Sequence, residues 1–114
     1  MRPGYYALCA LALLSLLVGC QKREEYPFEQ KATFMTLCVA KVRAEQAAHP
    51  QAPQRDDATV NRLCDCSMQE ISRAVPYKDY LAYLNAVNLH GTPDPKTVKA
   101  MSEAIASCQA QVYK

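Results

Sequence analysis

Two cysteines separated by a single residue, Cys64 and Cys66, constrain the fold of this chain more than any other feature. They lie in a segment whose apolar residues recur at i, i+3, i+4 and i+7, the pattern of an amphipathic helix. Residues two apart on a helix project about 200° apart around its axis. The two sulfur atoms therefore cannot bond to each other while the helix is intact. Each is expected to join a different neighbouring segment.

Helical periodicity appears in four segments of the chain. The first runs from about Phe28 to Ala48 and stops before two closely spaced prolines. Asp56 or Asp57 is suited to cap the second segment. Pro76 ends that segment and suits the first turn of the third. The stripe of the second segment is regular and consists of Val60, Leu63, Cys64, Ser67, Met68 and Ile71.

The last two segments complete the pattern. The third carries Tyr77, Tyr80, Leu81, Leu84 and Asn88 on one face. Gly91 is expected as its C-terminal cap, and Asp94 followed by Pro95 begins the fourth segment. The fourth presents Val98, Met101, Ile105, Cys108 and Val112. No segment alternates with a period of two, so the sequence predicts an all-α fold, a small disulfide-stapled bundle of about four helices with antiparallel neighbours.

The start of the chain carries an export pattern. A short segment containing Arg2 precedes an apolar run of 12 residues, 7–18, which is too short to span a bilayer as a helix. The run closes on Leu17-Val18-Gly19-Cys20, which resembles the lipobox of bacterial lipoproteins. That resemblance implies that residues 1–19 are a cleaved signal peptide and that Cys20 carries covalent lipid. Gln21 after the lipidated cysteine suggests transfer to the outer membrane, facing the periplasm.

Processing of this kind leaves four cysteines in the mature chain: Cys38, Cys64, Cys66 and Cys108. An even number in an exported protein predicts two disulfides. Two connectivities satisfy the opposed directions of the central pair. If the first two helices lie antiparallel, Cys66 is closer than Cys64 to the position of Cys38 along the helix axis. This weakly favours Cys38–Cys66 with Cys64–Cys108. The facing of the apolar stripes favours Cys38–Cys64 with Cys66–Cys108.

The mature chain is expected to hold one domain. Residues 20–27 are interpreted as the lipidated cysteine and a short charged linker, and residues 28–114 as the helical domain. Loss of residues 1–19 removes only Arg2 among the charged residues, leaving 12 Lys and Arg against 11 Asp and Glu. This balance argues against a nucleic-acid partner, which usually requires a clearly cationic surface.

No spacing in the sequence brings residues suited to catalysis close to one another. His49 and His90 fall in predicted turns, away from any nucleophile or paired carboxylate. The chain is therefore expected not to be an enzyme and to need no cofactor beyond the lipid on Cys20. The alternative interpretation is an envelope protein that binds a soft metal such as Cu(I) through the thiolates of Cys64 and Cys66. It requires this pair to be reduced and non-helical.

A protein-binding role is the favoured hypothesis. Tyr80, Tyr83 and Val87 flank the apolar stripe of the third segment and form a candidate binding patch, with Tyr83 expected to be the most exposed. A lipid-anchored helical domain with such a patch fits a non-enzymatic module that contacts an envelope protein. An assembly factor resembling a pilotin is one task of this type, and an immunity or entry-exclusion lipoprotein is another.

The lipobox leads to a direct test of processing. Cys20→Ala removes the thiol that receives lipid, so the variant should accumulate as an unlipidated precursor that retains residues 1–19. Mass spectrometry of the membrane fraction measures both features. Recovery of the wild-type chain as a soluble, unlipidated protein would contradict this interpretation.

Overall fold

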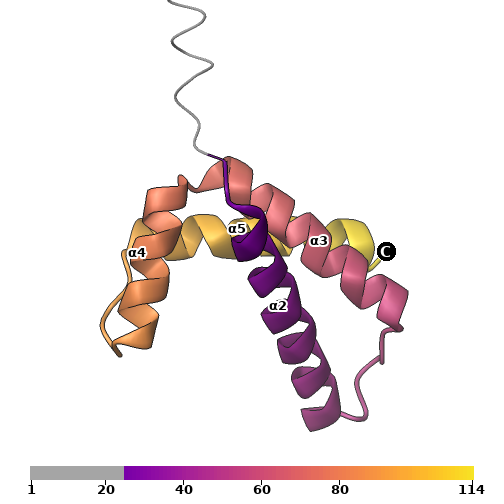
Figure 1. Ribbon diagram of the computed structural model, residues 1–114. Coiled ribbons are helices and arrows are strands. Elements are labelled where there is room, and N and C mark those ends of the chain that lie inside the picture. Colours follow the sequence, from indigo (N-terminus) through magenta and orange to yellow (C-terminus); the bar gives the residue numbers. More distant parts are fainter. Residues whose placement is uncertain (1–24) are drawn as a thin grey trace, which may run out of the picture.

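The computed structural model describes residues 25–114, and the predicted signal peptide and Cys20 lie outside this range. The described part is all-α, as predicted, and contains no strand. Its helices are α2 (Phe28–Ala48), α3 (Asp57–Ala74), α4 (Tyr77–Asn88) and α5 (Pro95–Val112). Figure 1 shows α5 crossing behind the other helices, while α2 and α4 start close together and diverge.

Two helices begin at the aspartates that the sequence indicates. Asp56 caps α3, and its Oδ1 accepts a hydrogen bond of 2.8 Å from the backbone N–H of Thr59. Hydrogen bonds from the Thr59 side chain and backbone hold the pKa of Asp56 below its ordinary value. Asp94 caps α5 in the same way, accepting from the N–H of Lys96 at 3.1 Å, with Pro95 as the first helical residue. These caps satisfy donors that a helix start leaves free.

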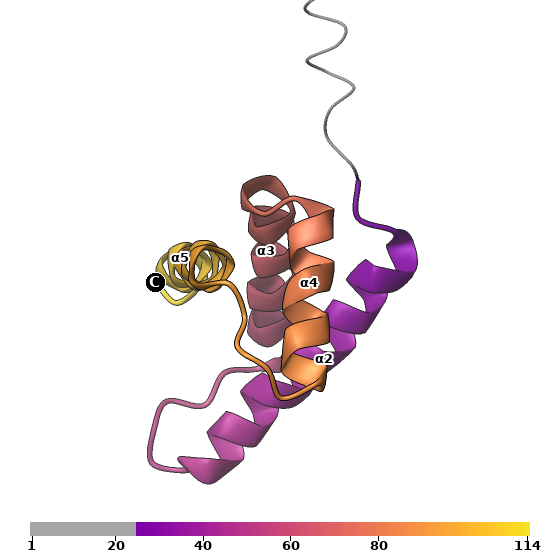
Figure 2. The ribbon, with the colours of Figure 1, turned by 90° about the vertical axis from the view of Figure 1, so that its left-hand side faces the viewer.

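The centre of the fold is α3, which packs against α5 on one side and crosses α2 on the other (Figures 1 and 2). Its buried residues are the six predicted ones: Val60, Leu63, Cys64, Ser67, Met68 and Ile71. The facing residues of α5 differ slightly from the prediction. Thr97 and Ala104 are buried with Met101 and Cys108, whereas Val98 is 39% exposed.

Tyr26 fixes the start of α2 to the rest of the fold. Although the sequence places it in the linker, its side chain is only 4% exposed. Its hydroxyl donates a 2.7 Å hydrogen bond to the backbone carbonyl of Val75, between α3 and α4. Its ring lies 5.0 Å from that of Tyr77 and 5.3 Å from that of Tyr80, measured between centroids. Burial raises the pKa of Tyr26 and of Tyr80 above the ordinary value of a tyrosine.

Helix α2 departs from the expected bundle. Phe34, Cys38 and Val42 recur every four residues in the sequence, a spacing that predicts a buried stripe. The structure differs, because α2 contains no buried residue. The helix crosses α3 obliquely (Figure 2) and diverges from α4 (Figure 1), and its apolar residues are covered only in part. The partly covered residues Phe34, Cys38 and Val42, together with exposed Leu37, form an accessible apolar strip along α2.

The left-handed residue that terminates α4 is His90, directly after the C-cap residue Leu89, and not Gly91 as predicted. His90 has a φ of 56°, in the left-handed region, whereas Gly91 does not have a positive φ. The N–H of His90 donates to the carbonyl of Val87 at 3.2 Å, and the N–H of Gly91 donates to that of Ala86 at 2.7 Å. These two bonds form a Schellman motif, which terminates the helix and satisfies its last carbonyls.

This cap predicts that glycine is favoured at position 90 and is not required at position 91. A left-handed conformation costs a non-glycine residue about 1–2 kcal/mol, and glycine removes this cost from the folded state. Part of the gain is offset because glycine also increases the conformational entropy of the unfolded chain. His90→Gly should therefore raise the free energy of unfolding by about 0.5–1 kcal/mol. Gly91→Ala is the control, because its new Cβ would lie 3.5 Å from the carbonyl oxygen of Ala86, an ordinary contact. Chemical denaturation measures both changes; a less stable His90→Gly variant would contradict the argument.

Candidate functional site

Two disulfides hold the helices on opposite sides of α3. Cys38 of α2 is bonded to Cys64, and Cys66 is bonded to Cys108 of α5. The Cα atoms of each pair lie 5.8 Å apart. The predicted divergence of Cys64 and Cys66 is confirmed, because each bridge leads to a different helix.

The weakly favoured pairing of Cys38 with Cys66, and of Cys64 with Cys108, is wrong. It rested on axial level, which assumes two antiparallel helices lying side by side. Since α2 crosses α3 obliquely (Figure 2), the facing of the apolar stripes decides the pairing. Cys64 faces α2 from the buried stripe, whereas Cys66 reaches α5 from the polar side of α3.

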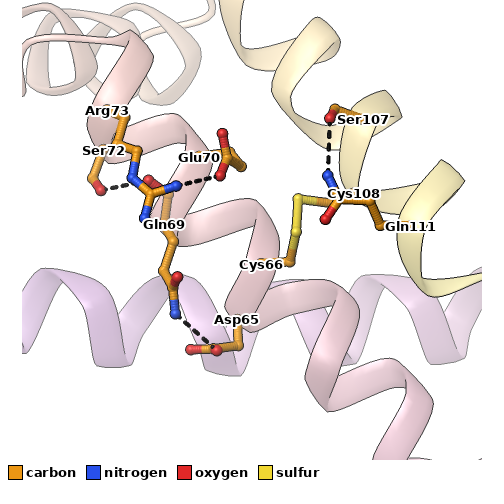
Figure 3. Close-up of polar contacts among 9 residues, drawn as sticks. All are labelled: Asp65, Cys66, Gln69, Glu70, Ser72, Arg73, Ser107, Cys108 and Gln111. Atoms are coloured by element: carbon orange, nitrogen blue, oxygen red, sulfur yellow. Dashed lines mark hydrogen bonds and ion pairs between the residues drawn. A yellow bond between two sulfur atoms is a disulfide. The ribbon is translucent and has the colours of Figure 1, made fainter.

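Figure 3 shows that polar side of α3. Close to the Cys66–Cys108 bridge, Asp65 accepts a hydrogen bond of 3.0 Å from the Nε2 of Gln69. One turn further on, Arg73 pairs with Glu70 at 2.6 Å. These contacts pair polar side chains with one another on an exposed surface of α3. Within residues 25–114 no group of three or more His, Cys, Asp or Glu side chains is arranged to hold a metal ion.

A groove of about 350 Å³ lies on the other side of α3, and all four helices contribute to it. We call it the α2 groove. One wall is the uncovered strip of α2, and the other comes from α4 and α5. Its apolar lining is formed by Phe34, Leu37, Cys38, Val42, Leu63, Tyr80, Tyr83, Leu84, Met101 and Ile105. Leu37 is 61% exposed on the α2 wall, which leaves a large apolar side chain in water beside the groove.

Polar groups occupy particular places in the α2 groove. Lys41 and Glu45, one turn apart on α2, line it and are exposed, as is Gln109 of α5. Neither Lys41 nor Glu45 belongs to an ion pair in the part of the chain that the structure describes. Ser67 also lines the groove; it is 1% exposed, and its hydroxyl has no hydrogen-bond partner among residues 25–114. An unpartnered hydroxyl of this kind is costly.

The far end of α2 is fixed by polar contacts. Arg43 pairs with Asp57 at the start of α3. In the connecting loop, the N–H of Arg55 donates to the Oε1 of Gln46 at 2.7 Å, and the Arg55 guanidinium lies 4.3 Å from the ring centroid of Tyr113. These contacts, the Cys38–Cys64 bridge and Tyr26 hold α2 at its two ends and its middle.

The predicted patch on α4 is not a continuous surface. Tyr80 is only 5% exposed and belongs to the core. Tyr83 is half-buried and lines the α2 groove, while Val87 is 45% exposed and lies outside the lining. Tyr83 was expected to be the most exposed of the three, which is wrong. The position of a residue around α4 does not by itself predict its exposure, because neighbouring helices cover the side of α4 that carries Tyr80 and Tyr83.

The binding patch predicted from the sequence lies on α4 and does not include the α2 wall or Leu37. A signal was present, because Met35, Leu37 and Val39 lie around the helix beside the expected stripe, and a core cannot cover all of these directions. His49 and His90 lie in exposed loops after α2 and α4, as predicted. No helix among residues 25–114 is long and apolar enough to cross a membrane.

Comparison of the chain with protein-family models, with curated proteins and with solved structures finds no match.

The disulfide pairing predicts two linked peptide pairs in a non-reducing digest, Cys38 with Cys64 and Cys66 with Cys108. Replacing both Cys38 and Cys64 with alanine should lower stability by about 2–4 kcal/mol and increase hydrogen exchange most strongly in α2, which has no buried residue. The control is alanine at both Cys66 and Cys108. Its α5 retains buried Met101 and Ala104, so exchange should not increase selectively in α2. A Cys38–Cys66 peptide would contradict the pairing.

Proposed function

We propose that this chain is a membrane-anchored envelope lipoprotein that binds another protein and is not an enzyme. The observation that carries the proposal is the α2 groove, an open apolar surface between α2, α4 and α5 whose lining includes the core residues Tyr80 and Met101. Binding sites are typically concave and mainly apolar with a few polar groups at defined places. Leu37, Tyr83 and Ile105 supply the apolar part, and Lys41 and Glu45 supply polar groups.

The position of the groove suits a lipid anchor at Cys20. The chain enters the fold at Tyr26, six residues after Cys20, and an extended segment of that length reaches only about 20 Å. From this end, α2 and α4 diverge, and their far ends point away from the chain entry (Figure 1). An anchor at Cys20 would therefore keep the groove near the membrane and leave its far end open. Confinement to a membrane raises the effective concentration of the domain toward a partner there.

The disulfides favour this function over soft-metal binding. The metal alternative requires free thiolates at Cys64 and Cys66, and each of these sulfur atoms is already bonded to a different helix. Binding one metal between them would require loss of both bridges and a change in the backbone of α3. Tasks consistent with the proposal are assembly of an envelope machine, as for a pilotin-like factor, and blocking of a toxin or mating apparatus, as for an immunity or entry-exclusion lipoprotein.

A matched pair of leucines tests the proposal. Leu37 lines the α2 groove and is 61% exposed, whereas Leu89 lies outside it and is 80% exposed. Leu37→Glu should weaken partner binding by 2 kcal/mol or more if Leu37 is central to the interface, and both glutamate variants should fold stably because surface changes cost little. Leu89→Glu should retain the partner.

The measurement is quantitative co-purification from membranes that carry the full-length lipoprotein, together with the melting temperature of each variant. Tyr83→Ala is less informative, since Tyr83 packs against the core and its loss should also lower stability. Identical co-purifying proteins for wild type and Leu37→Glu, at equal stability, would contradict a binding role for the groove.

A further inference from the structure

The shape and chemistry of the α2 groove suit one kind of secondary-structure element of a partner protein. This inference rests on the binding function proposed above. We propose that the occupant of the groove is an amphipathic α-helix of a partner protein, with an apolar face toward the groove and one acidic and one basic residue four positions apart. Three observations support this assignment: the length and volume of the groove, the chemistry of its walls, and the charges on α2.

The dimensions fit one face of a helix. The lining residues of α2 run from Phe34 to Glu45, which corresponds to about 16 Å, or three turns. A helix of that length and about 10 Å in diameter occupies roughly 1,200 Å³. A groove of about 350 Å³ therefore accepts the side chains of one face and leaves the opposite face in water. An amphipathic helix meets both conditions.

The walls disfavour an extended peptide. They consist of helices, whose backbone N–H and C=O groups are already paired, so the groove offers no sheet edge. An extended segment lying against Phe34, Leu84 and Ile105 would lose water from its backbone groups without gaining partners for them. A helix satisfies its own backbone internally and can present apolar side chains to the groove.

The charges on α2 define what the partner helix should carry. Lys41 and Glu45 are exposed, line the groove and make no ion pair in the described part of the chain. They are separated by one turn, about 6 Å along the axis. A helix lying along α2 would place an acidic residue opposite Lys41 and a basic residue opposite Glu45, also four positions apart. A purely apolar occupant, such as an acyl chain, would form no ion pair with either residue.

Photocrosslinking of the full-length lipoprotein in its native cells tests the assignment. Benzoylphenylalanine placed at Leu37 samples the groove, and the same residue at Leu89 samples an exposed position outside it. The expected result is a protein crosslink from position 37 and not from position 89. Mass spectrometry should place that crosslink in a segment with apolar residues at i, i+3, i+4 and i+7 and with an acid and a base four apart.

A synthetic peptide with the sequence of that segment then tests the charges. Lys41→Glu combined with Glu45→Lys keeps the net charge of the lipoprotein and should weaken binding of this peptide about tenfold. A peptide with its own acid and base exchanged should recover the affinity. Lys99→Glu combined with Glu103→Lys is the matched control, because these residues are also four apart and exposed but lie outside the groove. The control should bind like the wild type.

The outcomes separate this inference from the function on which it rests. A crosslink from position 37 to an extended segment, a second copy of the chain or lipid would overturn the helical partner. A crosslink only from position 89, or unchanged affinity after the Lys41 and Glu45 exchange, would also overturn it while leaving protein binding intact. Absence of crosslinked protein at both positions, together with no co-purifying partner, would overturn the proposed function itself.

Discussion

The opposed directions of Cys64 and Cys66 on α3 are the constraint on which the rest of the structure depends. Because residues two positions apart project about 200° apart around the helix axis, one bridge leads to α2 and the other to α5. A domain of this size buries a limited fraction of its surface and gains much from crosslinks. The bridges make α3 the common support for two helices that hardly contact each other.

The two supported helices are held by different means. α5 buries Met101, Ala104 and Cys108 against α3, so its bridge adds to an apolar contact. α2 buries no residue and depends on the Cys38–Cys64 bridge, the hydroxyl of Tyr26 and polar contacts near Arg55. A helix held in this way need not give its apolar strip to the core, and the strip becomes one wall of the α2 groove. The stabilising bridge and the candidate binding surface thus share one cause.

The different attachment of α2 and α5 bears on the proposed binding role. A protein that used the full apolar strip of α2 for its own core would have no groove, and a chain without the bridge would lose the covalent link that holds the middle of α2. The covalent link allows apolar residues such as Leu37 to stay exposed without loss of the fold. Exposed apolar surface of this kind usually serves recognition, which connects the disulfides to the proposed binding role rather than to metal chemistry.

Local sequence patterns determined most of the secondary structure. Helix starts followed from Asp56 and Asp94, whose side chains accept from nearby backbone groups and need no distant partner. The buried stripe of α3 also followed from sequence, since this central helix is covered on the side that its own periodicity marks. The tertiary structure alone decided which cysteines pair, that Tyr80 is buried and that the strip of α2 stays open. Each of these depends on the crossing of one helix over another, and that angle is set by contacts between residues far apart in the chain.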